Sequence, residues 1–160
     1  MENRLASEEI ARWHRHFAVD ANNQAWDLAA QATRTAEEDQ AMLNAAYAAA
    51  YHWAEVGTPL NGARADVALA HVHALLCHSR LALEHAWRCL AFFDANPHDG
   101  VDWDRGFAYA VLAHAGAAAG DRDLHADAYA RAAALGHAIA DAEDRTIFLD
   151  EFARIPATVS

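Results

Sequence analysis

Alanine, the residue with the highest helix propensity, makes up about a quarter of this 160-residue chain. Most of the polar residues are also good helix formers, and only seven glycines and three prolines are available for turns. No segment alternates between apolar and polar residues with the period of two that is typical of a half-buried strand. The chain is therefore predicted to be all-α.

Capping residues divide the sequence into seven or eight helices. Thr35 and Glu38 have the spacing of a capping box, and Thr58 precedes Pro59 in a first turn, where proline is favoured. The helices are expected at about residues 7–19, 22–33, 35–57, 58–78, 79–95, 102–119, 121–136 and 141–155. The expected caps are Asn22 or Asn23, Asp102, Asp121 or Asp123, and Asp141, and Gly136 is expected near a helix end. The short connections predict antiparallel neighbours.

A weak repeat of about 43 residues relates two parts of the chain. This shift aligns Leu69 with Leu112, Ala70 with Ala113 and His71 with His114. A pair of helices buries only part of its apolar surface, and further stacked pairs complete the core. We therefore expect three stacked helix pairs with capping helices at the ends.

The third predicted pair carries residues of a known repeat motif. These are Tyr109-x-x-Leu112-Ala113, then Gly120-Asp121, then Tyr129-x-x-Ala132, with Pro97 at the closing position of the pair before. Over about residues 22–140 the chain resembles tetratricopeptide-repeat proteins, although their period is about 34 residues. The resemblance implies one domain over residues 1–160, a right-handed α-solenoid of about three antiparallel hairpins with capping helices. It also implies that a peptide or partner protein binds in a concave groove, without catalysis.

A second likeness comes from short segments rather than from a repeat. Tyr51-His52-Trp53 and the segment from Ala70 to Leu76 are similar to segments of a group of short uncharacterised bacterial proteins. This likeness implies no activity.

Charge and hydropathy argue against several classes of protein. The 23 acidic and 12 basic residues give a formal charge of -11, and there is no basic stripe of the kind that binds nucleic acid. No run approaches the ~20 apolar residues of a membrane-spanning helix. The N-terminal sequence lacks a secretion signal, and Cys77 and Cys89 have neither metal nor redox spacing. We expect a cytoplasmic protein that binds neither nucleic acid nor membranes.

Eleven histidines are the most conspicuous source of side-chain chemistry in the chain. His71 and His114 are related by the repeat and lie on the helix face opposite the leucine stripe, the side that lines the groove in a tetratricopeptide hairpin. Phe107 and several alanines share this face. The two imidazoles could hold a carboxylate, a peptide carbonyl or a metal ion. The alternative is that both are hydrogen-bonded core residues between stacked helix pairs.

Four further candidates flank the expected groove. Arg64 could form paired hydrogen bonds to a carboxylate or phosphate, and His52 lies in the aromatic segment that ends the third predicted helix. Trp103 and Phe107 are four residues apart and could form a platform for a ligand. The alternative is aromatic packing together with a surface ion pair.

A metal site is the second functional hypothesis. The His-x-His pairs point to opposite sides of a helix, and neither the zinc-protease nor the di-iron ligand motif is present. Histidines from different helices could still bind a transition metal. We therefore expect a non-enzymatic module that binds a protein, peptide or small ligand in a groove, without a cofactor. The alternatives are a histidine-based metal protein or small metalloenzyme, and a homodimer that pairs through Phe92 and Phe93.

Overall fold

The prediction of an all-α structure is confirmed. A computed structural model describes residues 2–159, in which seven helices and no strand are found. The helices are α1 (Glu2–Ala29), α2 (Ala36–Val56), α3 (Pro59–Leu75), α4 (Ser79–Ala95), α5 (Asp102–Ala119), α6 (Arg122–Ala138) and α7 (Ala142–Phe152). Within this described part, none of the helices has the length and apolarity needed to cross a membrane.

The first two predicted helices are one continuous helix, so the expected break at Asn22 or Asn23 is wrong. Ala18, Ala25 and Ala29 are all buried and recur along one face of α1. This face packs against α2, where Ala25 and Ala29 share a core with Met42. Asparagine lowers helix propensity by only a few tenths of a kcal/mol, so the packing of the continuous apolar face outweighs it.

Most of the other helix starts agree with the predicted caps. Thr35 and Glu38 form reciprocal hydrogen bonds, and Thr58 pairs in the same way with Asn61. Asp121 and Asp141 accept hydrogen bonds from backbone N–H groups in the first turns of α6 and α7. Because each of these contacts joins residues two or three positions apart, local sequence is enough to place them.

Helix α1 begins at Glu2 rather than near residue 7, and two later boundaries also differ from the prediction. Asp102 does not cap α5, because its carboxylate accepts a hydrogen bond from the Ala140 amide. Val101 is the N-cap residue instead, and Asp104, three residues later, accepts a hydrogen bond from the Val101 amide at 2.8 Å. Helix α6 continues through Gly136 to Ala138, because Gly136 is a close-packing position rather than a stop.

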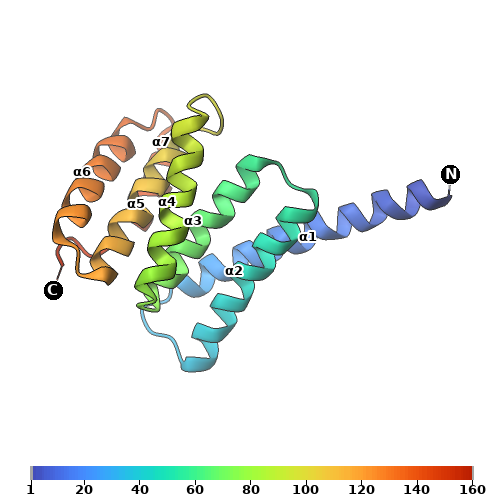
Figure 1. Cartoon of the computed structure of the whole chain (residues 1–160), viewed down its shortest axis with the longest axis horizontal. Helices are drawn as coiled ribbons and strands as arrows, with labels where there is room; N and C mark the ends of the chain where they lie inside the picture. The colour runs from blue at the N-terminus through green and yellow to red at the C-terminus, as the bar shows by residue number, and fades with distance from the viewer. Residues whose placement is uncertain (1, 160) are drawn as a thin grey trace.

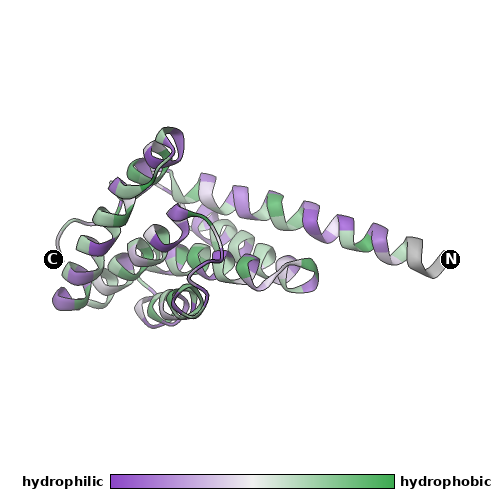
Figure 2. Cartoon of the chain, turned by 90° about the horizontal axis from the view of Figure 1, so that it is seen from above, coloured by the Kyte–Doolittle hydropathy of each residue, from purple (hydrophilic) through white to green (hydrophobic). Residues whose placement is uncertain are grey.

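The helices pack mainly against their neighbours in the chain. The most extensive contacts join α1 to α2, α3 to α4 and α5 to α6, and α3 also contacts α5. The pairs α1–α2 and α5–α6 lie at opposite ends of the molecule with α3 and α4 between them (Figure 1). The N-terminal part of α1 projects beyond the other helices, as the view from above also shows (Figure 2).

Small side chains dominate the core. Ala70, Ala82, Ala86 and Ala108 are fully buried, which allows neighbouring helices to approach closely. Larger residues fill the remaining space, and of the two residues expected at a homodimer surface, Phe93 is buried and Phe92 is half-buried. Phe93 is 1% exposed and packs edge to face against Phe92, with 5.3 Å between the ring centres.

Candidate functional site: an aromatic cavity

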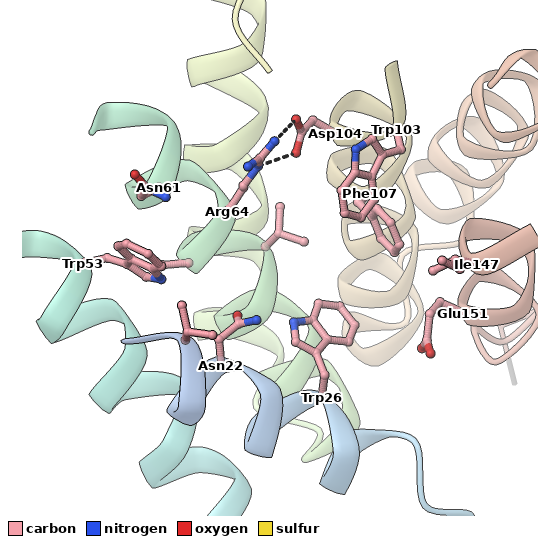
Figure 3. A pocket seen from close by; sticks show the side chains of 13 residues that line it. Asn22, Trp26, Trp53, Asn61, Arg64, Trp103, Asp104, Phe107, Ile147 and Glu151 are labelled. Carbon is pink, nitrogen blue, oxygen red and sulfur yellow. Dashed lines mark hydrogen bonds and ion pairs between the residues drawn. The ribbon is translucent and has the colours of Figure 1, made fainter. Parts of the chain in front are cut away.

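A cavity of about 440 Å³ opens between five of the helices. Helices α1, α2, α3, α5 and α7 all contribute side chains to it. The residues that line it are Val19, Asn22, Trp26, Trp53, Asn61, Arg64, Ala65, Val67, Trp103, Asp104, Phe107, Ile147 and Glu151. Figure 3 shows these side chains converging from segments that are distant in the sequence.

Aromatic rings form most of the walls. Trp103 and Phe107, from adjacent turns of α5, pack edge to face with their centres 5.5 Å apart. Trp26 of α1 packs against Phe107 at 6.1 Å, and Trp53 of α2 lies on the far side of the cavity (Figure 3). Aromatic rings have electrically negative faces and positive edges, so they favour offset-stacked or edge-on contact with another aromatic group.

An ion pair lies at one side of the cavity. Arg64 donates from Nε to Asp104 Oδ1 at 2.9 Å and from Nη2 to Oδ2 at 2.8 Å. The guanidinium carbon also lies 6.0 Å from the centre of the Trp103 ring, within range of a cation–π interaction. The hydrogen bond to Asp104 raises the pKa of Arg64. The charge of Arg64 is therefore balanced inside the protein.

The Nη1 atom of Arg64 is not used by Asp104. No hydrogen bond from Nη1 to another described residue is formed, whereas Nε and Nη2 are both engaged. Arg64 is only partly buried, with 41% of its side chain exposed. Two N–H donors on Nη1 thus remain for a hydrogen-bond acceptor that enters the cavity.

Asn61 and Glu151, two other polar residues on the lining, already have hydrogen-bond partners. The Asn61 side-chain oxygen accepts from the Thr58 amide at 2.9 Å as part of the α3 cap. Glu151 accepts from Arg154 at 2.8 Å. Each charged side chain on the cavity wall therefore has a partner of opposite charge.

Three of the six predicted site residues line this cavity, and three lie elsewhere. Arg64, Trp103 and Phe107 are on its wall. His71 lies behind the wall, where it is 5% exposed and stacks on Trp26 with 4.9 Å between ring centres. The expectation that His71 faces an open groove is therefore wrong, because Trp26 covers it.

His114 is next to His71 but does not reach the aromatic cavity. The two ring centres are 5.5 Å apart, and both rings are buried. His114 lines a smaller cavity of about 280 Å³ between the C-terminal ends of α3 and α5 and the last residues of the chain. Its Nδ1 atom has no hydrogen-bond partner among the described residues. A groove shared by both histidines is thus not formed.

Burial controls the protonation of this pair. Burial, reinforced by the charge of His114, lowers the pKa of His71 to about 3. Burial and the nearby His125 lower the pKa of His114 to about 4. Both imidazoles are therefore neutral at pH 7.

His52 lies on a separate surface formed by α1 and α2. Its Nδ1 is 3.0 Å from Nδ1 of His14, and the ring packs against Phe17 at 5.5 Å. The neighbouring Trp53 faces the cavity instead. The aromatic segment from 51 to 53 does contribute to the site, but through a different residue from the one the sequence favoured.

Trp26 and Asn22 are two lining residues that were not predicted to belong to the site. Asn22 was expected to cap a helix, and Trp26 was not among the predicted site residues. In the continuous helix α1, the two residues are four positions apart and face the cavity together. The i, i+4 spacing would have been a signal only if the helix had been predicted to continue.

Comparison with known proteins does not assign the chain to a family, since no family, curated protein or solved structure shows a significant match. Among the described residues, no group of three or more His, Cys, Asp or Glu side chains is arranged to hold a metal ion. The site must therefore be interpreted from its own geometry.

The Arg64–Asp104 pair gives a direct test of how the cavity wall is held. Asp104→Ala is expected to lower the free energy of unfolding by about 2–3 kcal/mol, because it removes three charge-assisted hydrogen bonds. The loss stays below the ~3–5 kcal/mol of a fully buried pair, since water can solvate the half-exposed Arg64. Urea denaturation of Arg64→Ala, Asp104→Ala and the double variant measures the coupling.

Asp94→Ala is the matched control for this experiment. Asp94 forms a 2.8 Å ion pair with Arg105, but the Asp94 side chain is 53% exposed, whereas that of Asp104 is 7% exposed. Exposed pairs of this kind contribute ~0–1 kcal/mol. Equal losses in Asp94→Ala and Asp104→Ala would show that the cavity pair is only a surface contact.

Proposed function

We propose that this protein is a non-enzymatic binding module that holds a small, uncharged ligand with an aromatic body in the aromatic cavity. The observation that carries the proposal is a cavity of about 440 Å³ walled by three tryptophans and a phenylalanine. Ligand pockets in proteins typically measure ~300–1,000 Å³ and combine apolar walls with a few placed polar groups.

The polar groups of the cavity favour a neutral ligand over an ion. Asp104 already neutralises Arg64, and Arg154 neutralises Glu151. A bound ion would thus have to displace a protein partner or remain uncompensated in an apolar site, which is unfavourable. A carbonyl oxygen, in contrast, can accept from the unused Nη1 of Arg64 without bringing a charge.

We also infer that the helix pairs are stacked in the manner of a tetratricopeptide solenoid. The extensive contacts of α1 with α2, α3 with α4 and α5 with α6 support this. The left-handed conformation of Gly120 between α5 and α6, with a φ of 72°, fits the turn position of the motif. In this arrangement, the cavity lies where the inner faces of successive pairs meet.

Naphthalene-1-carboxamide tests the proposal, because it combines a planar aromatic body with a neutral carbonyl. We expect it to bind and to change the intrinsic tryptophan fluorescence, and Trp103→Ala to weaken binding by about tenfold or more, since loss of an aromatic wall removes at least ~1.4 kcal/mol. Isothermal titration calorimetry gives the affinity, and circular dichroism confirms that the helices are retained.

Two controls make the result specific. Trp87→Ala removes a tryptophan that is 50% exposed and outside the cavity, so its affinity should match that of the unmodified protein. Naphthalene-1-carboxylate has the same ring with a negative charge and should bind at least tenfold more weakly. Equal affinity for the two compounds, or equal effects of both tryptophan substitutions, would contradict the proposal.

A further inference from the structure

A cluster of three imidazoles lies between α3 and α4, apart from the aromatic cavity. It consists of His73 on α3, His78 at the start of α4 and His85 two turns later. None of the three lines the cavity. The proposed function therefore makes no use of them, although eleven histidines were the most conspicuous feature of the sequence.

The closest contact in this cluster joins two nitrogen atoms. Nδ1 of His73 and Nδ1 of His78 are 3.1 Å apart. A single proton can lie between them, so at least one of the two nitrogens presents a lone pair. Two nitrogen atoms that bind the same metal ion through bonds of ~2.0–2.1 Å lie ~2.9–3.4 Å apart. The separation thus matches two adjacent ligands of one ion.

The outer nitrogen of His73 is held by a second residue. Its Nε2 lies 2.9 Å from the Tyr47 hydroxyl. When Nε2–H donates to this oxygen, the Nδ1 atom carries the lone pair and faces His78. Metal-binding histidines usually make such a contact through the ring nitrogen that does not bind the metal, and the contact fixes the tautomer and orientation of the ring.

The third imidazole sets the plane of the His73 ring. His85 stacks on it with the rings 6° from parallel and 5.7 Å between their centres. His85 Nδ1 donates to Asp66 at 2.7 Å, and Arg88 holds the same carboxylate oxygen at 3.2 Å. His73 is 1% exposed, so the surrounding protein holds its ring in place.

We propose that His73 and His78 bind one divalent transition-metal ion of the zinc, nickel and copper group through their Nδ1 atoms. Imidazole nitrogen is a preferred ligand of these metals, with copper bound more tightly than zinc. His78 is exposed, so water completes the coordination on the open side. The protein supplies two ligands. The buried ligand, His73, is oriented by Tyr47 and by His85, which is itself hydrogen-bonded to Asp66.

The chain contains a matched pair for comparison. His14 and His52 also place their Nδ1 atoms 3.0 Å apart. Among the described residues, neither of them contacts a carboxylate or a hydroxyl through its other ring nitrogen. This pair has the ligand spacing without the groups that orient a ligand, so it should bind a metal ion more weakly.

Titration of Zn²⁺ and Cu²⁺ into protein without an affinity tag tests the site. Isothermal titration calorimetry should show one tight equivalent of Zn²⁺, and the electron paramagnetic resonance of bound Cu²⁺ should show nitrogen ligands. His78→Gln should abolish the tight site while the helicity is retained, because His78 is exposed. His14→Gln should leave it unchanged.

Tyr47→Phe tests whether the Tyr47 hydroxyl orients His73 for metal binding. Tyr47 is 43% exposed, so the variant keeps its fold, and we expect its Zn²⁺ affinity to fall about 10–100-fold, as for other contacts behind metal ligands. Tight binding that survives in His78→Gln, or that His14→Gln removes equally, would overturn the proposal. Because the cavity is separate, binding of naphthalene-1-carboxamide should be the same in all three variants.

Discussion

Acidification from pH 7 to pH 5 is expected to lower the free energy of unfolding by about 4 kcal/mol, through His71 and His114 alone. Burial lowers the pKa of these groups to about 3 and about 4. In the unfolded chain, both return to an ordinary pKa of ~6.5. Each group then contributes ~1.4 kcal/mol per pH unit between its two pKa values.

The sign follows from proton uptake. Below pH 6.5, the unfolded chain binds protons at both histidines, whereas the folded protein does not until the pH approaches 4 and 3. Stability therefore falls as the pH falls through this window. The charges of Arg34, Arg154 and His125 act in the same direction as burial, because all of them disfavour an imidazolium ion.

Urea denaturation at pH 7, 6 and 5 measures this slope. His71→Gln should reduce the slope of unfolding free energy against pH by the contribution of one histidine, since glutamine does not titrate. This holds even if the variant is less stable at pH 7. His98→Gln is the control, because His98 is exposed. A slope that His71→Gln leaves unchanged would show that the folded protein binds a proton there as readily as the unfolded chain.

Phe148→Ala is expected to lower the free energy of unfolding by about 3–5 kcal/mol, the range for removing a fully buried aromatic ring. Phe148 is 0% exposed and packs against Phe107 at 4.9 Å between ring centres. Gly106 and Gly136 lie against its two edges, and a Cβ atom added at either would collide with the ring. The ring thus joins α7 to both α5 and α6.

Ile147→Ala is the matched control in the same helix. Ile147 is 49% exposed, and substitutions at such positions usually change stability by less than ~0.5 kcal/mol. Chemical denaturation of both variants provides the comparison.

Gly136→Ala adds a second measurement at the same contact. It should destabilise the protein by about 1–3 kcal/mol through overpacking, and this cost should disappear in the Phe148→Ala background. Additive losses in the double variant would show that the ring and Gly136 are not in contact.

Sequence patterns detect contacts within one helical turn more reliably than contacts between helices. The capping residues Thr35, Thr58 and Asp121 were found because their partners lie within one helical turn. The predicted break at Asn22 was wrong, because the apolar face of α1 continues past this residue and its packing outweighs the lower helix propensity of asparagine. Local rules describe a helix end well when no tertiary contact opposes them.

The candidate site was predicted only in part, because the sequence shows the spacing of residues along one helix but not the contacts between helices. The spacing of Trp103 and Phe107 placed both on one face of a helix, and they do lie together on the cavity wall. Arg64 was expected to bind a ligand carboxylate or phosphate, but its partner is Asp104, 40 positions away. Similarly, Trp26 covers His71, and no repeat or periodicity relates a tryptophan of α1 to a histidine of α3.

The sequence by itself determined that the chain is all-α, where most helices begin, and that its formal net charge is -11. These properties depend on helix propensity, on caps two or three residues apart and on composition, all of which act along the chain. Only the tertiary structure decided that three tryptophans from α1, α2 and α5 share a cavity and that His73 meets His78 and Tyr47. Those contacts depend on how the helices pack, which is set by the fit of many small side chains across helix interfaces rather than by any one segment.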